Sequence, residues 1–492
     1  MGQGEIPDDG VFSPISLPCG RTVQNRLVKV AMYEHLADFH GGPPNDLHCQ
    51  LYAKWAQYKW GMVFTGNVQV SSTHLTLGRD LVSPRVISKE TLRPFEKLLE
   101  SIRGPSNTNG TLAIMQLSHS GRQSANIIGG RLPFQRPLGP SSIRVKARNG
   151  GFLSDLIHGF AFQTPYEMST ADIDDVVEAF VRGAKVALEV GFDGIELHAA
   201  HGYLIAQFIS PKSNTRSDEY SSRPGAALHL LHRIIIAIRE VVPPGFVLGV
   251  KINAADYAES DEGASSNAAS EQETRALNHV STIASWGFVD FVEISGGDYE
   301  KPDFMTAEHP KSLRQALFAR FSEKAVKTLE ALPMDASSSL LPLILLTGGF
   351  RTSELLYTAL SSKHAHLLGF GRAAVISPDL PELVRGVGPS HSSWSQPFRP
   401  EPDLSTDFYW PRWFWSRMPR IPLVGAGVGT AWYVVRMRQL AALDSKRLHL
   451  VSERSHDMGS LGALLWMWVW VDWRGAALLL SSLILITGLV TT

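Results

Sequence analysis

GFDGIELHAAHGYLIAQFISPKSNTRSDEY, residues 191–220, joins an apolar run directly to a group of polar side chains. Its start, Phe192–Ala199, is apolar without alternation, which is typical of a strand covered on both faces, as in a parallel sheet wrapped by helices. The preceding segment, Ser169–Val190, begins with a capping pair, Ser169 and Asp172, and carries one apolar stripe. It therefore predicts a helix, and the two segments predict one helix–strand unit of an α/β protein.

Similar apolar runs recur along the chain, with helical patterns between them. We predict eight strands, at Asn25–Met32, Gly61–Val70, Thr111–Ser118, Phe192–Ala199, Phe246–Asn253, Phe288–Ser295, Leu341–Gly349 and Ala365–Arg372. Further helices are predicted near residues 46–60, 88–102, 229–242, 271–286 and 312–331. This alternation favours a closed (β/α)₈ TIM barrel within residues 1–390, and no GxGxxG motif follows an early strand. Residues 122–165, rich in Gly, Pro and Ser, predict a long loop on the substrate side.

The composition of the 492 residues argues against several classes of protein. The formal net charge is −1 and no basic stripe is present, which disfavours a nucleic-acid partner. The two cysteines, Cys19 and Cys49, predict neither a disulfide framework nor a cysteine metal centre. The start, MGQGEIPDDG, has no signal-peptide pattern. We therefore expect a cytosol-facing catalytic domain that acts on a small molecule.

Two histidines and a tyrosine follow the fourth predicted strand, at the end where barrels carry their active sites. His198, His201 and Tyr203 could be core residues, zinc ligands or hydrogen-bond donors. The nearest carboxylates, Asp193 and Glu196, lie back inside the strand, so a zinc site is disfavoured and no metal is expected. Donors aimed at a carbonyl or nitro oxygen, with a tyrosine as acid, suit hydride delivery to a conjugated carbon.

Glycines end the seventh and eighth predicted strands. Gly348-Gly349 and Gly371-Arg372 would let backbone N–H groups approach an anion, in the two loops that bind phosphate in many barrels. The glycines could also serve as turn residues only. The added Arg372 favours a phosphorylated cofactor.

These motifs together resemble the Old Yellow Enzyme family, the NADH:flavin oxidoreductase/NADH oxidase group of FMN-binding TIM barrels. The resemblance covers about Phe12–Leu383 and rests on NRLVKVAM, QLSHSGRQS, the 191–220 stretch, LGVKIN, EISGG, LTGGF and LGFGR. It implies FMN as cofactor, NAD(P)H as co-substrate and ping-pong reduction of a carbonyl-conjugated C=C bond. The alternative is FMN-dependent oxidation, demethylation or rearrangement of a biosynthetic intermediate.

The resemblance also implies roles for individual residues. The cofactor-binding residues would be Ala31, Met32, Asn67 and Gln116 around the flavin ring, Lys251 near its N1–O2 region, and Gly348, Gly349, Gly371 and Arg372 at the phosphate. His198 and His201 would bind the activating oxygen of the substrate, and Tyr203 would protonate the carbon opposite the hydride. Tyr33 stands where relatives usually place Thr or Cys, so it would either point elsewhere or occupy part of the substrate space.

An extension, residues 391–458, and an apolar tail, residues 459–492, follow the predicted barrel. Within the extension, residues 419–439 resemble the arm that packs on the barrel in this family. In the tail, tryptophans precede an uncharged run near 475–490, which predicts a short membrane-anchoring helix with the barrel on the cytosolic side. An oligomer contact or an error at the end of the gene would also account for this run. The oligomeric state stays open.

Overall fold

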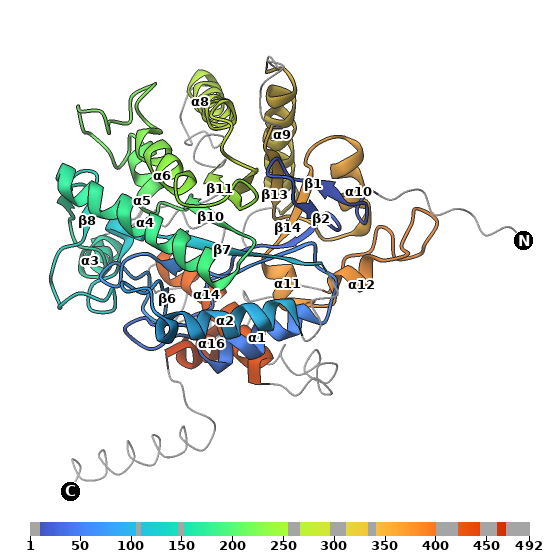
Figure 1. Cartoon of the computed structure of the whole chain (residues 1–492), viewed down its shortest axis with the longest axis horizontal. Coiled ribbons are helices and arrows are strands. Elements are labelled where there is room, and N and C mark those ends of the chain that lie inside the picture. The colour runs from blue at the N-terminus through green and yellow to red at the C-terminus, as the bar shows by residue number, and fades with distance from the viewer. Residues whose placement is uncertain are drawn as a thin grey trace, which may run out of the picture.

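The computed structural model describes residues 10–104, 110–145, 152–253, 266–295, 311–332, 341–399, 422–442 and 460–468. In this part of the chain, eight parallel strands form a closed barrel surrounded by helices (Figure 1). Around the ring they are β3 (Leu27–Lys29), β4 (Met62–Phe64), β7 (Leu112–Ser118), β10 (Gly194–Ala199), β11 (Val247–Asn253), β12 (Phe291–Ser295), β13 (Leu343–Thr347) and β14 (Leu367–Phe370). The pairing of β14 with β3 closes the ring. The predicted TIM barrel is confirmed, and each strand lies within its predicted range.

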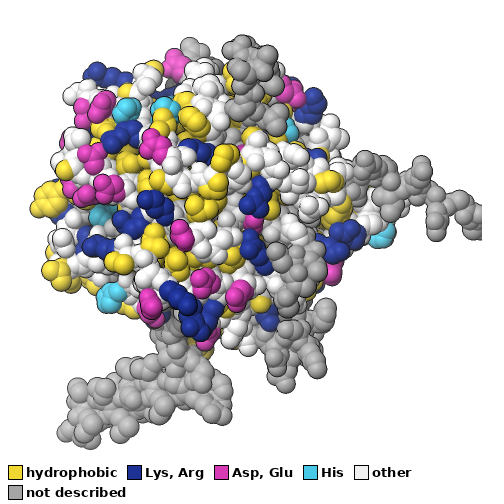
Figure 2. All heavy atoms as spheres, in the orientation of Figure 1, with side chains coloured by type: hydrophobic (Ala, Val, Ile, Leu, Met, Phe, Trp, Pro, Cys, Tyr) yellow, Lys and Arg dark blue, Asp and Glu magenta, His cyan; other side chains and the backbone are white. Residues whose placement is uncertain are grey.

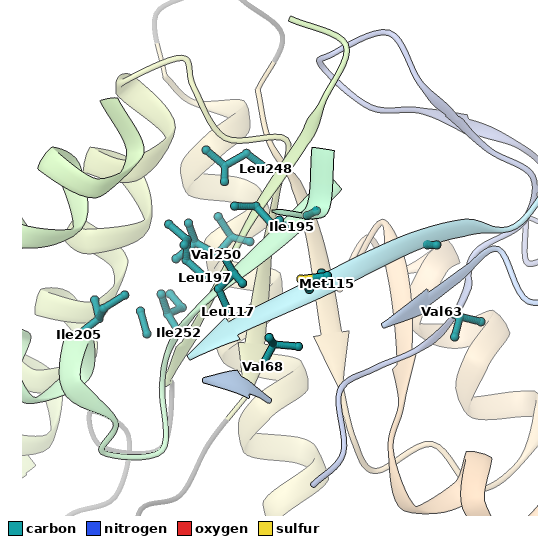
Figure 3. Close-up of a cluster of buried hydrophobic side chains, with 14 of the residues drawn as sticks. Val63, Val68, Met115, Leu117, Ile195, Leu197, Ile205, Leu248, Val250 and Ile252 are labelled. Atoms are coloured by element: carbon teal, nitrogen blue, oxygen red, sulfur yellow. The ribbon is translucent and has the colours of Figure 1, made fainter. Parts of the chain in front are cut away.

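The outward faces of the strands are apolar and are covered by helices. Figure 3 shows part of this layer, in which Met115, Leu197 and Val250 lie among other buried aliphatic side chains. The covering helices are α1 (Asp46–Ala56), α2 (Lys89–Arg103), α4 (Thr170–Val190), α6 (His229–Arg239), α8 (Ser266–Ser285), α9 (Lys311–Glu330) and α10 (Ser353–Ser361). The predicted capping pair of α4 is present, because the Ser169 side chain accepts from the N–H of Asp172. Burial of both strand faces explains why the sequence shows apolar runs without alternation.

The inside of the barrel is apolar at the amino ends of the strands. There Met62, Val247 and Leu367 form one buried cluster with Leu17 and Val23. The last two come from a hairpin of β1 (Ile15–Ser16) and β2 (Thr22–Val23), which covers this end. The interior is tightly filled, since a Cβ at Gly249 would lie 2.0 Å from the ring of Phe291. This end of the barrel is therefore packed core, and the polar interior lies toward the other end.

Shorter elements fill the connections between the barrel strands. They are β5 (Val68–Gln69), β6 (Leu81–Val82), the 3-10 turn Gly121–Gln123, β8 (Leu138–Gly139), α3 (Phe152–Ala161), β9 (Tyr166–Glu167) and α5 (Leu204–Ile209). The short helices α11 (Arg372–Ile376) and α12 (Leu380–Val384) follow the last strand, β14. β8 and β9 pair in parallel, with α3 between them in the sequence. The described parts of the segment 122–165 thus contain more secondary structure than the predicted loop, because the turn-rich composition conceals the largely apolar helix FLSDLIHGFA.

Two helices follow the barrel in the described part of the chain. α14 (Pro422–Ala442) packs against α1 and α11, and α16 (Ser460–Trp468) packs against α14 (Figure 1). Neither of these nor any other described helix has the length and apolar character needed to cross a bilayer. The anchor predicted near 475–490 lies outside the described residues. On the face seen in Figure 2, basic and acidic side chains are interspersed, in keeping with the net charge of −1.

Candidate active site

The carboxyl ends of the barrel strands bring the candidate residues to one end of the molecule. His198 lies near the end of β10, in register with Lys251 of the neighbouring strand β11. Gly348 directly follows β13, and Gly371 directly follows β14. Because the barrel strands are all parallel, these positions share the same rim. The histidines and the glycine–arginine turn therefore face the same end of the barrel.

A left-handed turn after β10 positions the histidines and the tyrosine. His201 has φ 55° and Gly202 has φ 72°, so two successive residues adopt the left-handed conformation. Such a conformation costs a non-glycine residue roughly 1–2 kcal/mol and is found most often where function requires it. The turn places Tyr203 at the N-cap of α5. Its ring stands at 89° to the ring of His198, with 4.5 Å between centroids.

Hydrogen bonds specify which ring nitrogen of each histidine carries a proton. Burial, followed by the proximity of His201 and Lys251, holds the pKa of His198 well below its usual range, so its ring is neutral. His198 Nδ1 accepts from the N–H of Ala200 at 3.3 Å, which leaves the proton on Nε2. His198 Nε2 then donates to His201 Nδ1 at 3.2 Å, and His201 Nε2 lies 3.1 Å from Ser295 Oγ. Both rings thus carry their protons on Nε2.

The Tyr203 hydroxyl is part of a buried polar network. Asn67 Nδ2 donates to its oxygen at 3.1 Å, and Thr76 Oγ1 lies 3.5 Å away. Because Asn67 supplies a donor, the phenol keeps its own proton for donation elsewhere. Asn67, expected beside the flavin ring, thus contacts the candidate acid directly.

Four polar side chains from neighbouring strands meet inside the barrel. Lys251 Nζ lies 2.8 Å from Glu293 Oε1, with both side chains almost wholly buried. On the next strand pair, Gln116 Nε2 donates to Glu196 Oε2 at 2.6 Å. Burial, and then the charge of Glu293, holds the pKa of Glu196 well above its usual range. Lys251 is therefore paired with Glu293, and the protonated carboxyl group of Glu196 lies beside them.

The described residues fit a phosphorylated flavin at this rim. Gly348 and Gly349 have φ of 97° and 86°, a conformation that glycine adopts without strain, and a Cβ at Gly348 would meet no atom within 4 Å. Arg372 begins α11 beside them. Gln116 Oε1 is buried without a hydrogen-bond partner among the described residues, as expected of a group that awaits a ligand. The guanidinium, glycine backbone and orphaned amide are suited to a phosphate and a flavin ring.

Met32, Ala31 and Tyr33 extend this rim from the end of β3. A Cβ at Gly371 would lie 2.9 Å from Met32 Sδ, so Met32 borders the glycine–arginine turn, and Ala31 packs at the edge of the barrel interior. The Tyr33 hydroxyl donates to the carbonyl of Gly78 and lies 3.3 Å from Asp80 Oδ2. The Tyr33 hydroxyl is thus held against the loop between β5 and β6.

The sequence alone did not identify Glu293, Ser295, Thr76 or Asp80 as part of this rim. A charged residue inside the apolar run FVEIS was a signal that Glu293 faces the barrel interior, since an outward position would place it under helices. Thr76 and Asp80 lie in a loop without hydrophobic periodicity, so no pattern marked them. Only the closed barrel brings that loop beside Tyr203.

Comparison with known proteins places the chain in a family. Residues 10–387 match the NADH:flavin oxidoreductase / NADH oxidase family. An NADH-dependent flavin oxidoreductase of Neonectria sp. (strain DH2) is 35% identical over 379 residues, which are 75% of this chain and 46% of that protein. Another, from Talaromyces variabilis, is 32% identical over 438 residues, 87% of this chain and 97% of that protein. The chain thus spans less than half of the first relative and nearly all of the second.

Solved structures share the fold at lower identity. Morphinone reductase is 19% identical with a TM-score of 0.56, over 77% of this chain and 90% of that one. An Old Yellow Enzyme homologue from Zymomonas mobilis is 20% identical with a TM-score of 0.57, over 76% of this chain and 91% of that one. The match across most of the barrel and the relatives at above 30% identity lead to one conclusion. The chain belongs to the NADH:flavin oxidoreductase / NADH oxidase family, the Old Yellow Enzyme group of FMN-dependent oxidoreductases that use NAD(P)H.

Proposed function

We propose that this chain reduces a C=C bond conjugated to a carbonyl group, with NAD(P)H as electron donor. The observation that carries the proposal is the cluster of His198, His201 and Tyr203 at the barrel rim, with the tyrosine ring perpendicular to the first histidine. When bound, FMN supplies the chemistry of accepting a hydride from NAD(P)H and passing it to a substrate carbon. NAD(P)H and the substrate would use the same space in turn, which gives ping-pong kinetics.

The two histidines would bind the carbonyl oxygen of the substrate. Neutral rings with protons on Nε2 are hydrogen-bond donors. In this structure His198 donates to His201 Nδ1, and His201 Nε2 is directed to Ser295 Oγ. A carbonyl oxygen that gains negative charge is a stronger acceptor than an imidazole nitrogen or a hydroxyl. Such donors are worth roughly 3 kcal/mol each to a transition state that develops an enolate. The neutral state of His198 suits it to donate without itself carrying charge.

Tyr203 would deliver the proton that completes the reduction. Its hydroxyl lies beside His198 and is oriented by Asn67, so its own proton is directed away from that amide. The substrate carbon next to the carbonyl gains this proton as the other carbon gains the hydride. A positioned acid of this kind contributes about 10²–10⁴-fold to the rate.

Lys251 and the glycine–arginine turn would hold the cofactor. Gly348, Gly349, Gly371 and Arg372 would enclose the phosphate, and Ala31, Met32, Asn67 and Gln116 would line the ring. Lys251 would place its charge near the N1–O2 edge, where negative charge accumulates on reduction. Tyr33 would border the substrate space through its ring, since its hydroxyl is engaged with Gly78 and Asp80.

Anaerobic half-reactions test this function. Purified enzyme is reduced with NADH or NADPH, and 2-cyclohexen-1-one is then mixed with it while flavin absorbance is followed. We expect rapid reoxidation by the enone, and roughly 100-fold slower reoxidation in Tyr203→Phe with flavin reduction unchanged. Tyr220→Phe, which alters a buried tyrosine bonded to Arg233 outside the rim, is the matched control and should behave as wild type. Failure of enones to reoxidise the enzyme would contradict the proposal and favour an oxidation or rearrangement.

A further inference from the structure

A chain of buried polar side chains leads away from the Tyr203 hydroxyl. Thr76 Oγ1 lies 3.5 Å from the phenol oxygen, and the Thr76 backbone N–H donates to Asp80 Oδ2 at 3.1 Å, which holds the Thr76 side chain beside the same carboxyl group. Gln69 Nε2 donates to both Thr76 Oγ1 and Asp80 Oδ1, each at 3.1 Å. The four side chains come from the β5–β6 segment and from the turn after β10. All four are buried, so no solvent competes for these bonds.

The donors around this chain fix the direction in which its protons point. Asn67 donates to the Tyr203 oxygen, which can accept a second donor, so the phenol keeps its own proton for the substrate. Gln69 donates to the Thr76 oxygen, so the Thr76 proton is available to Tyr203 Oη. The second lone pair of Thr76 Oγ1 can accept from the carboxyl group of Asp80 when that group is protonated. An unbroken sequence of hydroxyl groups thus joins Tyr203 to one carboxyl group.

Asp80 is in a position to hold a proton near neutral pH. Burial raises its pKa to about 7, while hydrogen bonds from Gln69, Thr76 and Tyr33 act in the opposite direction. Of the other titratable groups near it, Tyr33 approaches from the loop after β3 and Tyr203 from the turn after β10. The guanidinium of the adjacent Arg79 is directed elsewhere, since it donates to the carbonyl of Ala37.

We propose that Asp80 and Thr76 form a proton relay that restores the Tyr203 hydroxyl as this tyrosine protonates the substrate. The relay rests on the function proposed above. As the Oη–H bond of Tyr203 breaks, the Thr76 hydroxyl proton moves to Tyr203 Oη, and the carboxyl proton of Asp80 moves to Thr76 Oγ1. One proton leaves Asp80 overall, and no electrons move along the chain. Asp80 regains a proton from the side of Tyr33, whose partly exposed side chain marks the solvent end of the network.

In the relay, Asp80 and Thr76 are positioning residues that act through Tyr203. Two oxidants, one that needs a proton on carbon and one that does not, test whether these residues act on proton transfer. An enone needs a proton on carbon, whereas ferricyanide removes electrons from the same reduced flavin without protonation of carbon. Asp80→Asn should therefore slow reoxidation by 2-cyclohexen-1-one roughly 10-fold at pH 6 and leave reoxidation by ferricyanide unchanged. Thr76→Val, which breaks the chain in the middle, should reproduce the same pattern.

The pH dependence supplies a second readout. Because the protonated carboxyl group is the active form, the enone rate of the wild type should fall as pH rises through about 7. Asp80→Asn should lack this fall, and the two enzymes should converge at high pH. A structural defect would lower the rate at all pH values and would not depend on the oxidant.

The Asp80→Asn variant should keep the fold, because its new amide can still find hydrogen-bond partners. Gln69 Oε1 is buried without a partner among the described residues, so in Asp80→Asn a flip of the Gln69 amide lets it accept from the new amide and from Thr76. Ser83→Ala is the matched control, because Ser83 donates its backbone N–H to the carbonyl of Gln69 but has no place in the chain. It should match the wild type with both oxidants.

Each outcome separates the relay from the function on which it rests. If Tyr203→Phe slows reoxidation of the flavin by the enone and neither Asp80→Asn nor Thr76→Val does, the relay is wrong, but Tyr203 is still supported as the acid. If Tyr203→Phe is without effect, the proposed acid itself is wrong. If Asp80→Asn slows flavin reoxidation by ferricyanide as much as reoxidation by the enone, Asp80 has only a structural role and the relay is also wrong.

Discussion

Replacing both interior carboxyl groups should destabilise the apoprotein far more than replacing either one. Lys251 Nζ lies 2.8 Å from Glu293 Oε1, and both side chains are almost fully buried. At this distance an effective dielectric constant of about 20 gives an attraction of about 6 kcal/mol. Desolvation offsets part of it, so loss of the partner of a buried charge costs about 3–5 kcal/mol. That is the expected loss for Glu196→Gln/Glu293→Gln.

The single variants should each cost only about 1 kcal/mol, because the second carboxyl group can replace the first. The charge of Glu293 is one of the causes that raise the pKa of Glu196. In Glu293→Gln that repulsion disappears, so Glu196 can ionise and neutralise Lys251. In Glu196→Gln the ion pair with Glu293 stays in place. The two substitutions are therefore coupled, and their effects should not add.

Urea unfolding of the FMN-free protein measures this coupling. Adding Lys251→Met to the double variant removes the unpaired cation, so the triple variant should recover most of the lost stability. Additivity of the two single substitutions within about 0.5 kcal/mol would refute the reasoning. So would a triple variant as unstable as the double one, since the penalty would then not come from an unpaired lysine.

The remaining predictions concern the cofactor, the substrate pocket and the acid stability of the fold. Arg372→Ala should weaken FMN binding roughly 10–100-fold in a fluorescence titration, whereas Arg385→Ala, whose guanidinium lies over the ring of Phe12, should leave it unchanged. His198→Ala should weaken binding of a phenol, followed by its charge-transfer absorbance, roughly 10-fold while FMN is retained, and loss of FMN would contradict its role. Burial, and then Arg79, lowers the pKa of His35 to about 3. A depressed pKa gives stability that is present above about pH 6.5 and lost as pH falls, so His35→Phe should reduce the loss of unfolding free energy between pH 7 and pH 5 by about 2 kcal/mol. An unchanged difference between the two pH values would show that His35 is accessible to protons in the fold.

The sequence predicted those features that depend on local pattern. Continuous apolar runs marked the strands, and the stretch around His198 carried both the strand end and the reactive side chains. The pairing of Lys251 with Glu293 could not be predicted, because register between strands 42 residues apart depends on the closed barrel. The direction of Tyr33 depends in turn on Gly78 and Asp80, which no periodic pattern connects to it.

Composition was misleading where turn residues surround a helix. The segment 122–165 contains enough Gly, Pro and Ser to predict a loop, yet α3 forms within it. Among its described side chains His158 is buried, whereas Leu156 and Phe160 are largely exposed, so a count of apolar and turn residues decides neither its burial nor its conformation.

Closure of the ring between β14 and β3 has a consequence for biosynthesis. Arg26 donates to the carbonyl of His366, a partner 340 residues away in sequence. While the ribosome is still making the intervening segments, the first strand has one unsatisfied edge and its apolar faces lack part of their cover. We expect the nascent protein to be vulnerable to aggregation until that late segment emerges, so slower translation at low temperature or added chaperone should raise the soluble yield more than stabilising substitutions do.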